Sequence, residues 1–308
     1  MNALSDTVED YLSVRRSLGF KLTVYGRLLG DFVAYVDAAG ATTVTTAIAV
    51  AWAVQPKNAT PRWWAHRLNV VRGFARHLHA LDPTAEVPPV MLLASSARRR
   101  EPHLYSDAEI STLMDEARLL RPQLRGATYE TLIGLIAVCG LRPGEALRLD
   151  RRDVDLAEGL LRIVGTKFDK NRDVPVQAST MEALDRYGRL RDRCWPVPRS
   201  VSFFVSRTGK RPGIGIVDAT FRGLLRRAGI TSPSHRRPPR LHDLRHSFSV
   251  KTLTGWYAAD LDVDARMALL STYLGHSNPS HTYWYLSASP ELLSLAAGRR
   301  EHANQGRT

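Results

Sequence analysis

The sequence of 308 residues contains few cysteines and no long apolar segment. Its two cysteines, Cys139 and Cys194, exclude a cysteine-rich zinc module and a disulfide framework. The longest apolar run, residues 131–141, is far shorter than the roughly 18–20 residues that cross a bilayer. The first residues also lack the basic and then apolar pattern of a secretion signal. We therefore expect a cytoplasmic protein that does not contact a membrane.

Lysine is scarce too, because only six of the 43 basic residues are lysines. Arginine is the better bidentate phosphate ligand, but a genome rich in G and C also favours arginine codons. The ratio of arginine to lysine therefore has two explanations. The formal net charge of +13 is explained by neither codon usage nor ordinary metabolic chemistry, and it favours a polyanionic partner such as DNA.

Residues 1–95 show helical periodicity with little strand signal, so we expect a helical domain there. Its third helix is predicted to begin at Thr60, which can cap it, followed by Pro61. Basic side chains recur at three or four residues along one side of this helix. They form either a solvated surface or a face that contacts the DNA backbone, and the net charge favours DNA. The residues concerned are Arg62, His66, Arg72 and Arg76.

The periodicity fails between residues 82 and 102, and we predict a basic linker at 96–104. Its adjacent arginines, Arg98, Arg99 and Arg100, are either solvated or follow the phosphate backbone. The second domain, residues 105–308 with a C-terminal tail, opens with a capping-box pattern from Ser106 to Glu109. The fold class expected is mainly α with a small β-sheet, because a predicted hairpin interrupts the helices. Its strands are expected at residues 159–166 and 172–176.

One candidate for chemistry is Arg142. Gly140 can end one helix and Pro143 can open the next, which places Arg142 beside a helix N-terminus. Backbone N–H groups and a guanidinium that converge in this way suit a phosphate. The alternative is a structural salt bridge between Arg142 and Glu145.

A second candidate pair, His242 and Arg245, shares one side of a helix that two prolines delimit. One of these side chains can exchange a proton and the other carries a fixed charge. A rival interpretation makes His242 and His246 zinc ligands, with Asp243 as the acidic partner. No motif for a third ligand follows in the sequence.

A third cluster contains His276 and an aromatic group, Tyr283 to Tyr285. Gly275 is expected to end a helix just before it. Taken alone, these aromatic residues indicate a core or an interface rather than catalysis.

Taken together and in this order, these pieces resemble the tyrosine recombinase family, also called phage integrases. The resemblance covers roughly residues 101–290, and the aromatic context of Tyr285 is similar to that of recombinases carried by transposons and other mobile elements. It implies that residues 1–95 are a core-binding domain. The matching residues are Arg142 and Glu145 in Gly-Leu-Arg-Pro-Gly-Glu, Lys167 in the hairpin, His242 and Arg245, His276, and Tyr285, which comes nine residues after His276.

The resemblance implies a phosphoryl transfer in which a tyrosine oxygen attacks a DNA phosphodiester and forms a 3′-phosphotyrosyl bond. No metal or other cofactor is needed in this scheme. The implied roles are Tyr285 as nucleophile, Arg142 and Arg245 as phosphate clamp, Lys167 as general acid, His242 as general base or hydrogen-bonding group, His276 as a further phosphate donor, and Glu145 as the residue that orients Arg142. Lys170 is an alternative acid, and Tyr283 and Tyr273 are alternative phenols. His246 is expected to be a core or backbone-bonded histidine.

The sequence thus predicts a site-specific DNA recombinase or transposase. The resemblance also implies double-stranded DNA as partner and a homo-tetramer on DNA, or an assembly with related recombinases. The alternatives are a catalytically silent DNA-binding protein and, more distantly, a zinc-dependent hydrolase.

Overall fold

The computed structural model describes residues 3–93, 101–164, 171–231, 238–276, 278, 280–287 and 292. The chain divides into two compact units, residues 1–100 and 101–308. Each unit has its own buried hydrophobic cluster. The linker arginines Arg98, Arg99 and Arg100 and the hairpin lysines Lys167 and Lys170 lie outside the described residues.

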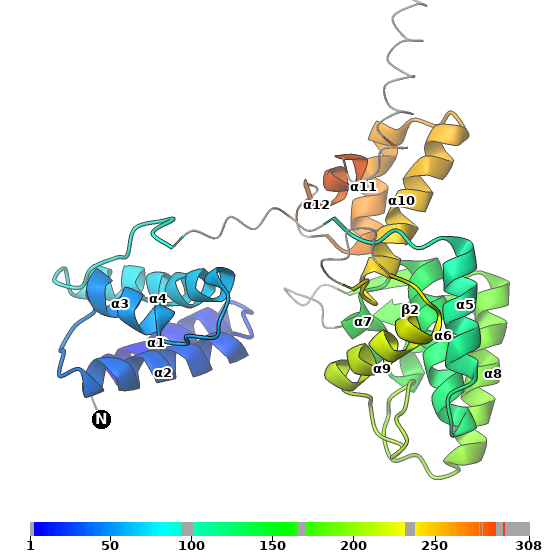
Figure 1. Cartoon of the computed structure of the whole chain (residues 1–308), viewed down its shortest axis with the longest axis horizontal. Coiled ribbons are helices and arrows are strands. Elements are labelled where there is room, and N and C mark those ends of the chain that lie inside the picture. The colour runs from blue at the N-terminus through cyan, green and yellow to red at the C-terminus, as the bar shows by residue number, and fades with distance from the viewer. Residues whose placement is uncertain are drawn as a thin grey trace, which may run out of the picture. The chain divides into compact units, whose positions relative to one another are not determined.

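The N-terminal unit is helical, as expected, and its longest helix packs against the others (Figure 1). Leu68 and Val71 of this helix are buried in one cluster with Phe32 and Trp52. The helix starts where the sequence predicts, because the Thr60 side chain accepts the backbone N–H of Trp63 at 3.3 Å, but it is the fourth helix and not the expected third. The helices of residues 3–93 are α1 (Ala3–Ser17), α2 (Thr23–Ala38), α3 (Thr46–Val54) and α4 (Pro61–Leu81).

The C-terminal unit is built around the helix of residues 123–139, which contacts helices on several sides (Figure 1). The predicted capping box is present at the start of the unit, where Ser106 and Glu109 bond each other's backbone N–H. The helices are α5 (Asp107–Arg118), α6 (Gln123–Cys139), α7 (Pro143–Arg148), α8 (Ala178–Cys194), α9 (Ile214–Arg227), α10 (Asp243–Ala258), α11 (Val263–Leu274) and α12 (Ser280–Tyr283), with short 3-10 turns η1 (Arg151–Asp153) and η3 (Trp284–Ser287).

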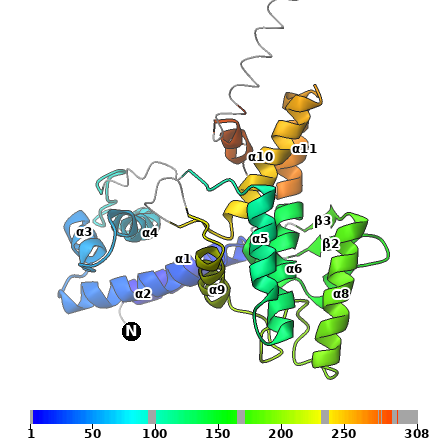
Figure 2. The same cartoon turned by 45° about the vertical axis from the view of Figure 1, so that its right-hand side comes forward.

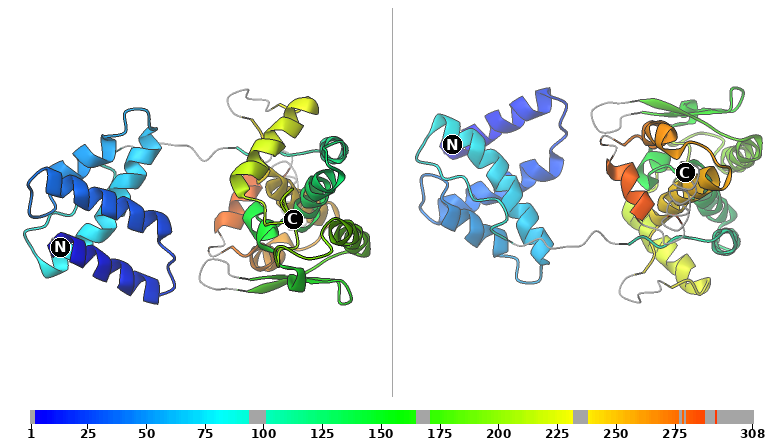
Figure 3. Two further views of the ribbon diagram at one scale, coloured as in Figure 1. Left: turned by 90° about the horizontal axis from the view of Figure 1, so that it is seen from below. Right: turned by 90° about the horizontal axis from the view of Figure 1, so that it is seen from above.

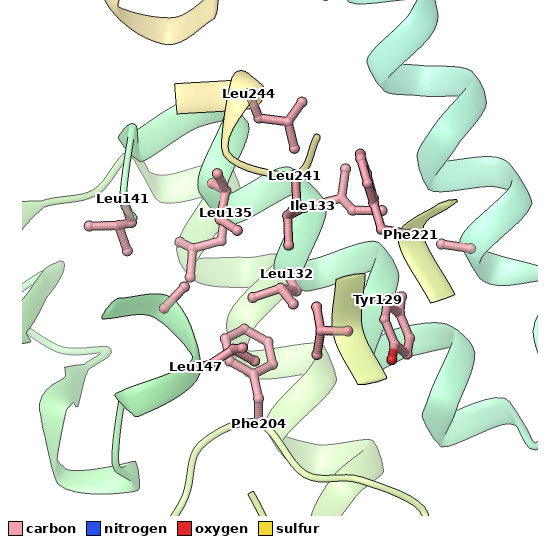
Figure 4. Close-up of a cluster of buried hydrophobic side chains, with 14 of the residues drawn as sticks. Tyr129, Leu132, Ile133, Leu135, Leu141, Leu147, Phe204, Phe221, Leu241 and Leu244 are labelled. Carbon is pink, nitrogen blue, oxygen red and sulfur yellow. The ribbon is translucent and has the colours of Figure 1, made fainter. Parts of the chain in front are cut away.

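The core of this unit surrounds α6. Figure 4 shows Leu132 and Ile133 among apolar side chains from other elements, which include Phe204, Phe221 and Leu244. These five side chains are almost completely buried. The apolar run at the end of α6 is therefore a core helix of a globular unit. None of the helices in the described ranges combines the length and apolar character that crossing a bilayer requires.

A small antiparallel sheet lies at one edge of the unit, with β2 and β3 side by side (Figure 2). Its strands are β1 (Val154–Asp155), β2 (Leu160–Ile163) and β3 (Arg172–Pro175). The predicted hairpin is confirmed by the pairing of Leu161 with Val174 and of Ile163 with Arg172. Strand β1 was not predicted, because two residues are too few to show a period.

A second cluster of the C-terminal unit joins the later part of α10 to α11 and η3. Figure 3 shows the orange and red segments of α11 and α12 close to α10. Tyr285 belongs to this cluster together with Leu253, Leu270 and Leu274. The packing of α11 on α10 therefore places the segment that follows Gly275 against the start of α10.

We expect replacement of Gly140 by Ala to destabilise the protein. Gly140 ends α6 with φ of 59°, and an added Cβ would lie 2.4 Å from Cδ1 of Phe248. The overlap and the left-handed backbone should lower the free energy of unfolding by about 1–3 kcal/mol, measured by urea unfolding. Gly255→Ala is the matched control, because no atom lies within 4 Å of its added Cβ. The control should be unchanged or more stable by about 0.5–1 kcal/mol. Equal midpoints for the two variants would contradict the prediction.

Candidate active site

Arg142 and Arg245 meet at the C-terminal end of α11. Arg142, which immediately precedes α7, donates from Nη2 to the carbonyl of Gly275 at 2.9 Å. Arg245, in the first turn of α10, donates to the carbonyl of Leu274 at 2.6 Å and to that of Gly140 at 2.8 Å. The end of a helix carries unpaired carbonyls and a partial negative charge, so it favours two guanidinium groups. The structure therefore brings the two predicted clamp residues together.

Glu145 is the anion of the site, with a side chain only 1% exposed. Its Oε1 lies 2.6 Å from Nη1 of Arg142, and its Oε2 accepts the Arg142 backbone N–H at 3.0 Å. Oε2 also lies 3.9 Å from Nη1 of Arg245. The structure thus contains the Arg142–Glu145 salt bridge that the sequence left open. Glu145 holds both the side chain and the backbone of Arg142.

Arg172 is a third cation at this carboxylate, and the sequence reasoning missed it. Its Nη2 lies 2.9 Å from Oε2 of Glu145 and its Nη1 lies 3.2 Å from Oε1. Burial alone would raise the pKa of Glu145, but the hydrogen bonds and charge of Arg172, together with Arg142, lower it to about 2. A signal was present in the sequence. Arg172 alternates with Val174, so both lie on the inward face of a strand, where an unpaired arginine is unfavourable.

His242 and His246 lie one turn apart, with ring centroids separated by 4.9 Å. Burial and the charge of Arg245 lower the pKa of His242 to about 4, and burial and His242 lower that of His246 to about 3. Both imidazoles are therefore neutral at pH 7. Within the described ranges, no three His, Cys, Asp or Glu side chains lie close enough together to hold a metal ion.

Tyr285 lies beside these histidines in η3, and its side chain is almost completely buried. Its hydroxyl is hydrogen-bonded to Nδ1 of His246 at 3.1 Å. His246 is partly buried, in line with the expected core histidine, but its Nδ1 bonds the candidate nucleophile rather than the backbone. Periodicity along α10 could not show this contact, because Tyr285 reaches His246 from a different element.

The alternative phenols have different surroundings. Tyr283 is 48% exposed. Tyr273 stacks on Phe248, with centroids 5.8 Å apart, and burial raises its pKa above the ordinary value of a phenol. Of the three phenols, Tyr285 is the one whose hydroxyl bonds a histidine of α10.

His276 directly follows the residue that ends α11, Gly275, whose φ is 65° as the sequence led us to expect. Its Nδ1 is hydrogen-bonded to the hydroxyl of the buried Thr282 at 2.7 Å. Its ring is roughly parallel to that of Tyr285, with centroids 6.3 Å apart. The predicted residues Arg142, Glu145, His242, Arg245, His276 and Tyr285 are thus gathered at one site.

The basic residues predicted on α4 do not share one environment. Arg62 and Arg76 are exposed. His66 is partly buried and stacks on Trp63, with ring centroids 5.3 Å apart. Arg72 is buried instead, which corrects the expectation that it belongs to an exposed basic face. Its guanidinium donates to Asn69 and, at 2.7 and 2.6 Å, to the carbonyls of Pro88 and Pro89. The segment after α4 turns back over this side of the helix, which helical periodicity cannot reveal.

Comparison with known sequences places these features among DNA recombinases. A model of the phage integrase family matches residues 104–291. A protein of Sinorhizobium fredii that carries the name integrase/recombinase y4rB is 42% identical over the whole of both chains. The tyrosine recombinase XerC of Chlorobaculum tepidum is 28% identical over 73% of this chain and 68% of its own.

Solved structures with the same fold include two complexes with DNA. The recombinase XerH bound to its palindromic difH substrate, a post-cleavage complex, matches with a TM-score of 0.67 and 19% identity over 96% of this chain and 85% of that one. The Tn1549 transposon integrase with transposon right end DNA matches with a TM-score of 0.66 and 14% identity over 98% and 99% of the two chains. The fold of both units is therefore that of these proteins.

We expect Arg72→Ala and Arg76→Ala to separate stability from DNA contact. Arg72→Ala leaves the buried carbonyl of Pro88 without this donor, so the free energy of unfolding should fall by about 1–3 kcal/mol in urea unfolding. Arg76→Ala should leave stability unchanged and weaken DNA binding. The slope of the logarithm of the binding constant against the logarithm of the salt concentration should become shallower by about one unit. A stable Arg72→Ala protein would contradict the structural role assigned to Arg72.

Proposed function

Because the chain belongs to the phage integrase family, we propose that it is a site-specific DNA recombinase that cuts and rejoins strands through a 3′-phosphotyrosyl intermediate. The observation that carries this proposal is the gathering of Arg142, Arg245, His242, His276 and Tyr285 at the end of α11. The net charge of +13 supports a polyanionic substrate. The substrate proposed is double-stranded DNA.

Strand cleavage transfers the phosphoryl group from the 5′-oxygen of one nucleotide to the tyrosine. The Tyr285 oxygen attacks phosphorus, the bond from phosphorus to the 5′-oxygen breaks, and the 3′-phosphate stays on the protein. The guanidiniums of Arg142 and Arg245, with His276, stabilise charge on the nonbridging oxygens. His242, neutral because its pKa is lowered to about 4, can accept the phenol proton or bond a phosphate oxygen.

The proton balance also requires an acid for the leaving 5′-oxygen, and Lys167 is proposed for it. Rejoining is the reverse reaction, in which a 5′-hydroxyl attacks the phosphotyrosyl bond and returns its proton. Since no water is consumed, the energy of the phosphodiester bond is retained.

The described arrangement is a closed one, because Arg245 and Tyr285 are only 1% and 2% exposed. The segment that carries Tyr285 therefore has to shift before DNA can reach them.

The alternatives receive less support. A catalytically silent DNA-binding protein would have no need to keep a nucleophile together with two arginines at one site. The zinc hydrolase would require a third ligand beside His242 and His246, and within the described residues no three His, Cys, Asp or Glu side chains lie close enough together to hold a metal ion. Strand transfer is therefore the function that the site supports best.

Recombination joins two duplexes, so we infer a homo-tetramer on DNA, or an assembly with related recombinases, acting in the cytoplasm on a mobile element. In the helical unit the exposed Arg62 and Arg76, with His66, are the proposed backbone contacts. Arg98, Arg99 and Arg100 are proposed to follow the DNA between the two units.

Replacement of Tyr285 by Phe should abolish covalent attachment to DNA and leave binding intact. The assay uses nicked DNA from the ends of the element that carries the gene, with a chelator present, and resolves protein–DNA adducts under denaturing conditions. Wild-type protein should give a shifted band, and Tyr285→Phe should give none despite specific binding in a native gel. Tyr283→Phe and Tyr273→Phe are the matched controls and should keep the adduct. An adduct formed by Tyr285→Phe would remove Tyr285 as the nucleophile.

Loss of the general acid should be rescued by a better leaving group. With Lys167→Ala, adduct formation on ordinary DNA should slow by about 10²–10⁴-fold. DNA whose scissile 5′-oxygen is replaced by sulfur should react at nearly the wild-type rate, because a thiolate leaves without protonation. Lys170→Ala should behave like wild type on both substrates. The opposite pattern for the two lysines would assign the acid to Lys170.

A further inference from the structure

Arg172 connects the hairpin to the phosphate clamp. It is the first residue of β3 and follows closely the segment that contains Lys167. Its guanidinium lies against both oxygens of Glu145, and its side chain is only 13% exposed. Its Nε is buried and has no hydrogen-bond partner among the described residues. Glu145 is therefore the carboxylate that compensates the buried charge of Arg172.

The same guanidinium also packs against Gly275. A Cβ added to Gly275 would lie 2.7 Å from Nη1 of Arg172 and 3.1 Å from its Cζ, so the guanidinium lies directly against the Gly275 backbone. Gly275 is the residue whose carbonyl accepts the hydrogen bond from Arg142. Arg172 and Arg142 thus share two contacts, the carboxylate of Glu145 and the backbone at the end of α11.

We propose that Arg172 is a positioning residue for strand transfer, which fixes β3 to Glu145 and to the end of α11 and thereby holds Arg142 of the phosphate clamp in place. This inference rests on the function proposed above. Arg172 acts through Glu145 and Arg142. It therefore differs from a surface ion pair of the same hairpin, that of the exposed Arg162 with Asp173 at 3.4 Å.

The electrostatics give this role a measurable signature. The charges that face Glu145 are those of Arg142 just before α7, Arg172 of β3 and Arg245 of α10, while His242 and Tyr285 interact with Arg245. With Arg172 present, the pKa of Glu145 is about 2, so the carboxylate is ionised throughout the working range. Without Arg172, burial is opposed by Arg142 and the more distant Arg245 alone, and the pKa rises.

A protonated Glu145 is a poor acceptor for the Arg142 guanidinium. In an Arg172→Gln protein, the rate of adduct formation should therefore fall as the pH drops through the raised pKa. The wild-type rate should show no such loss until the pH is much lower. If Arg172 only stabilised the fold, its replacement would lower the amount of folded protein. It would not shift the acid limb, which is the pH range in which the rate falls.

The activity experiment compares full-length wild type, Arg172→Gln, Arg172→Lys and Arg162→Gln on the nicked DNA described above, between pH 5 and pH 9. Arg172→Gln should form the adduct about 10²-fold more slowly, bind DNA with unchanged affinity and show an acid limb at higher pH. Arg172→Lys should restore part of the rate, because it keeps the charge but loses the paired hydrogen bonds. Arg162→Gln should match wild type. An unchanged rate for Arg172→Gln, or a slower rate with an unmoved pH profile, overturns the inference.

Glu145→Gln variants test whether Arg172 acts through the carboxylate. Adding Arg172→Gln to Glu145→Gln should slow adduct formation only slightly more than Glu145→Gln alone. Neither the single Glu145→Gln variant nor the double variant should show the acid limb. Fully additive losses would mean that Arg172 acts independently of Glu145, and would overturn the inference.

Urea unfolding without DNA separates failure of this inference from failure of the proposed function. The pKa of Glu145 in the unfolded chain, roughly 4.3, is the same in both proteins and cancels in the comparison. The stability difference is therefore constant above the raised folded pKa of Arg172→Gln, and it shrinks as the pH falls from there toward the wild-type value of about 2. The midpoint difference between wild type and Arg172→Gln should be largest at pH 7.5 and shrink once the pH falls through the raised pKa. In the Glu145→Gln background it should not depend on pH. A pH-independent difference between wild type and Arg172→Gln overturns the inference, whereas absence of any wild-type adduct would overturn the recombinase function.

Discussion

The buried carboxylate of Glu145 is the constraint on which the site depends. A charge that is 1% exposed must be compensated within the protein, and compensation comes from arginines at the start of α7, in β3 and in α10. Three elements that are far apart in the sequence are thereby held at one point. Each guanidinium has more donors than Glu145 can accept, so these cations can also donate to a phosphate.

The end of α11 is the second fixed point. Gly275 ends the helix in a left-handed conformation, and its carbonyl and that of Leu274 receive Arg142 and Arg245. The residues that follow, which include His276 and Tyr285, are consequently placed beside the clamp. The neutral His246 then holds the phenol in a buried position. The same packing that aligns the site also keeps its nucleophile covered.

Local features of the fold were predictable because they depend on neighbouring residues alone. Thr60 and Ser106 begin helices through side-chain caps, and Gly140 and Gly275 end them through left-handed backbone. Arg72 was not predictable in the same way. Helical periodicity placed it beside exposed arginines, whereas its burial depends on where the chain returns after α4.

The sequence by itself determined the charge of the protein, the ends of its helices and the ordered set of residues that identifies the phage integrase family, because each is a property of composition or of short segments. Only the tertiary structure decided that Arg172 shares Glu145 with Arg142 and that His246 bonds Tyr285. These contacts join residues that are 27 and 39 positions apart, and the contact of Arg142 with Gly275 spans 133 positions. Such contacts depend on how helices and strands pack, and side-chain packing between distant elements is not encoded in any one local pattern.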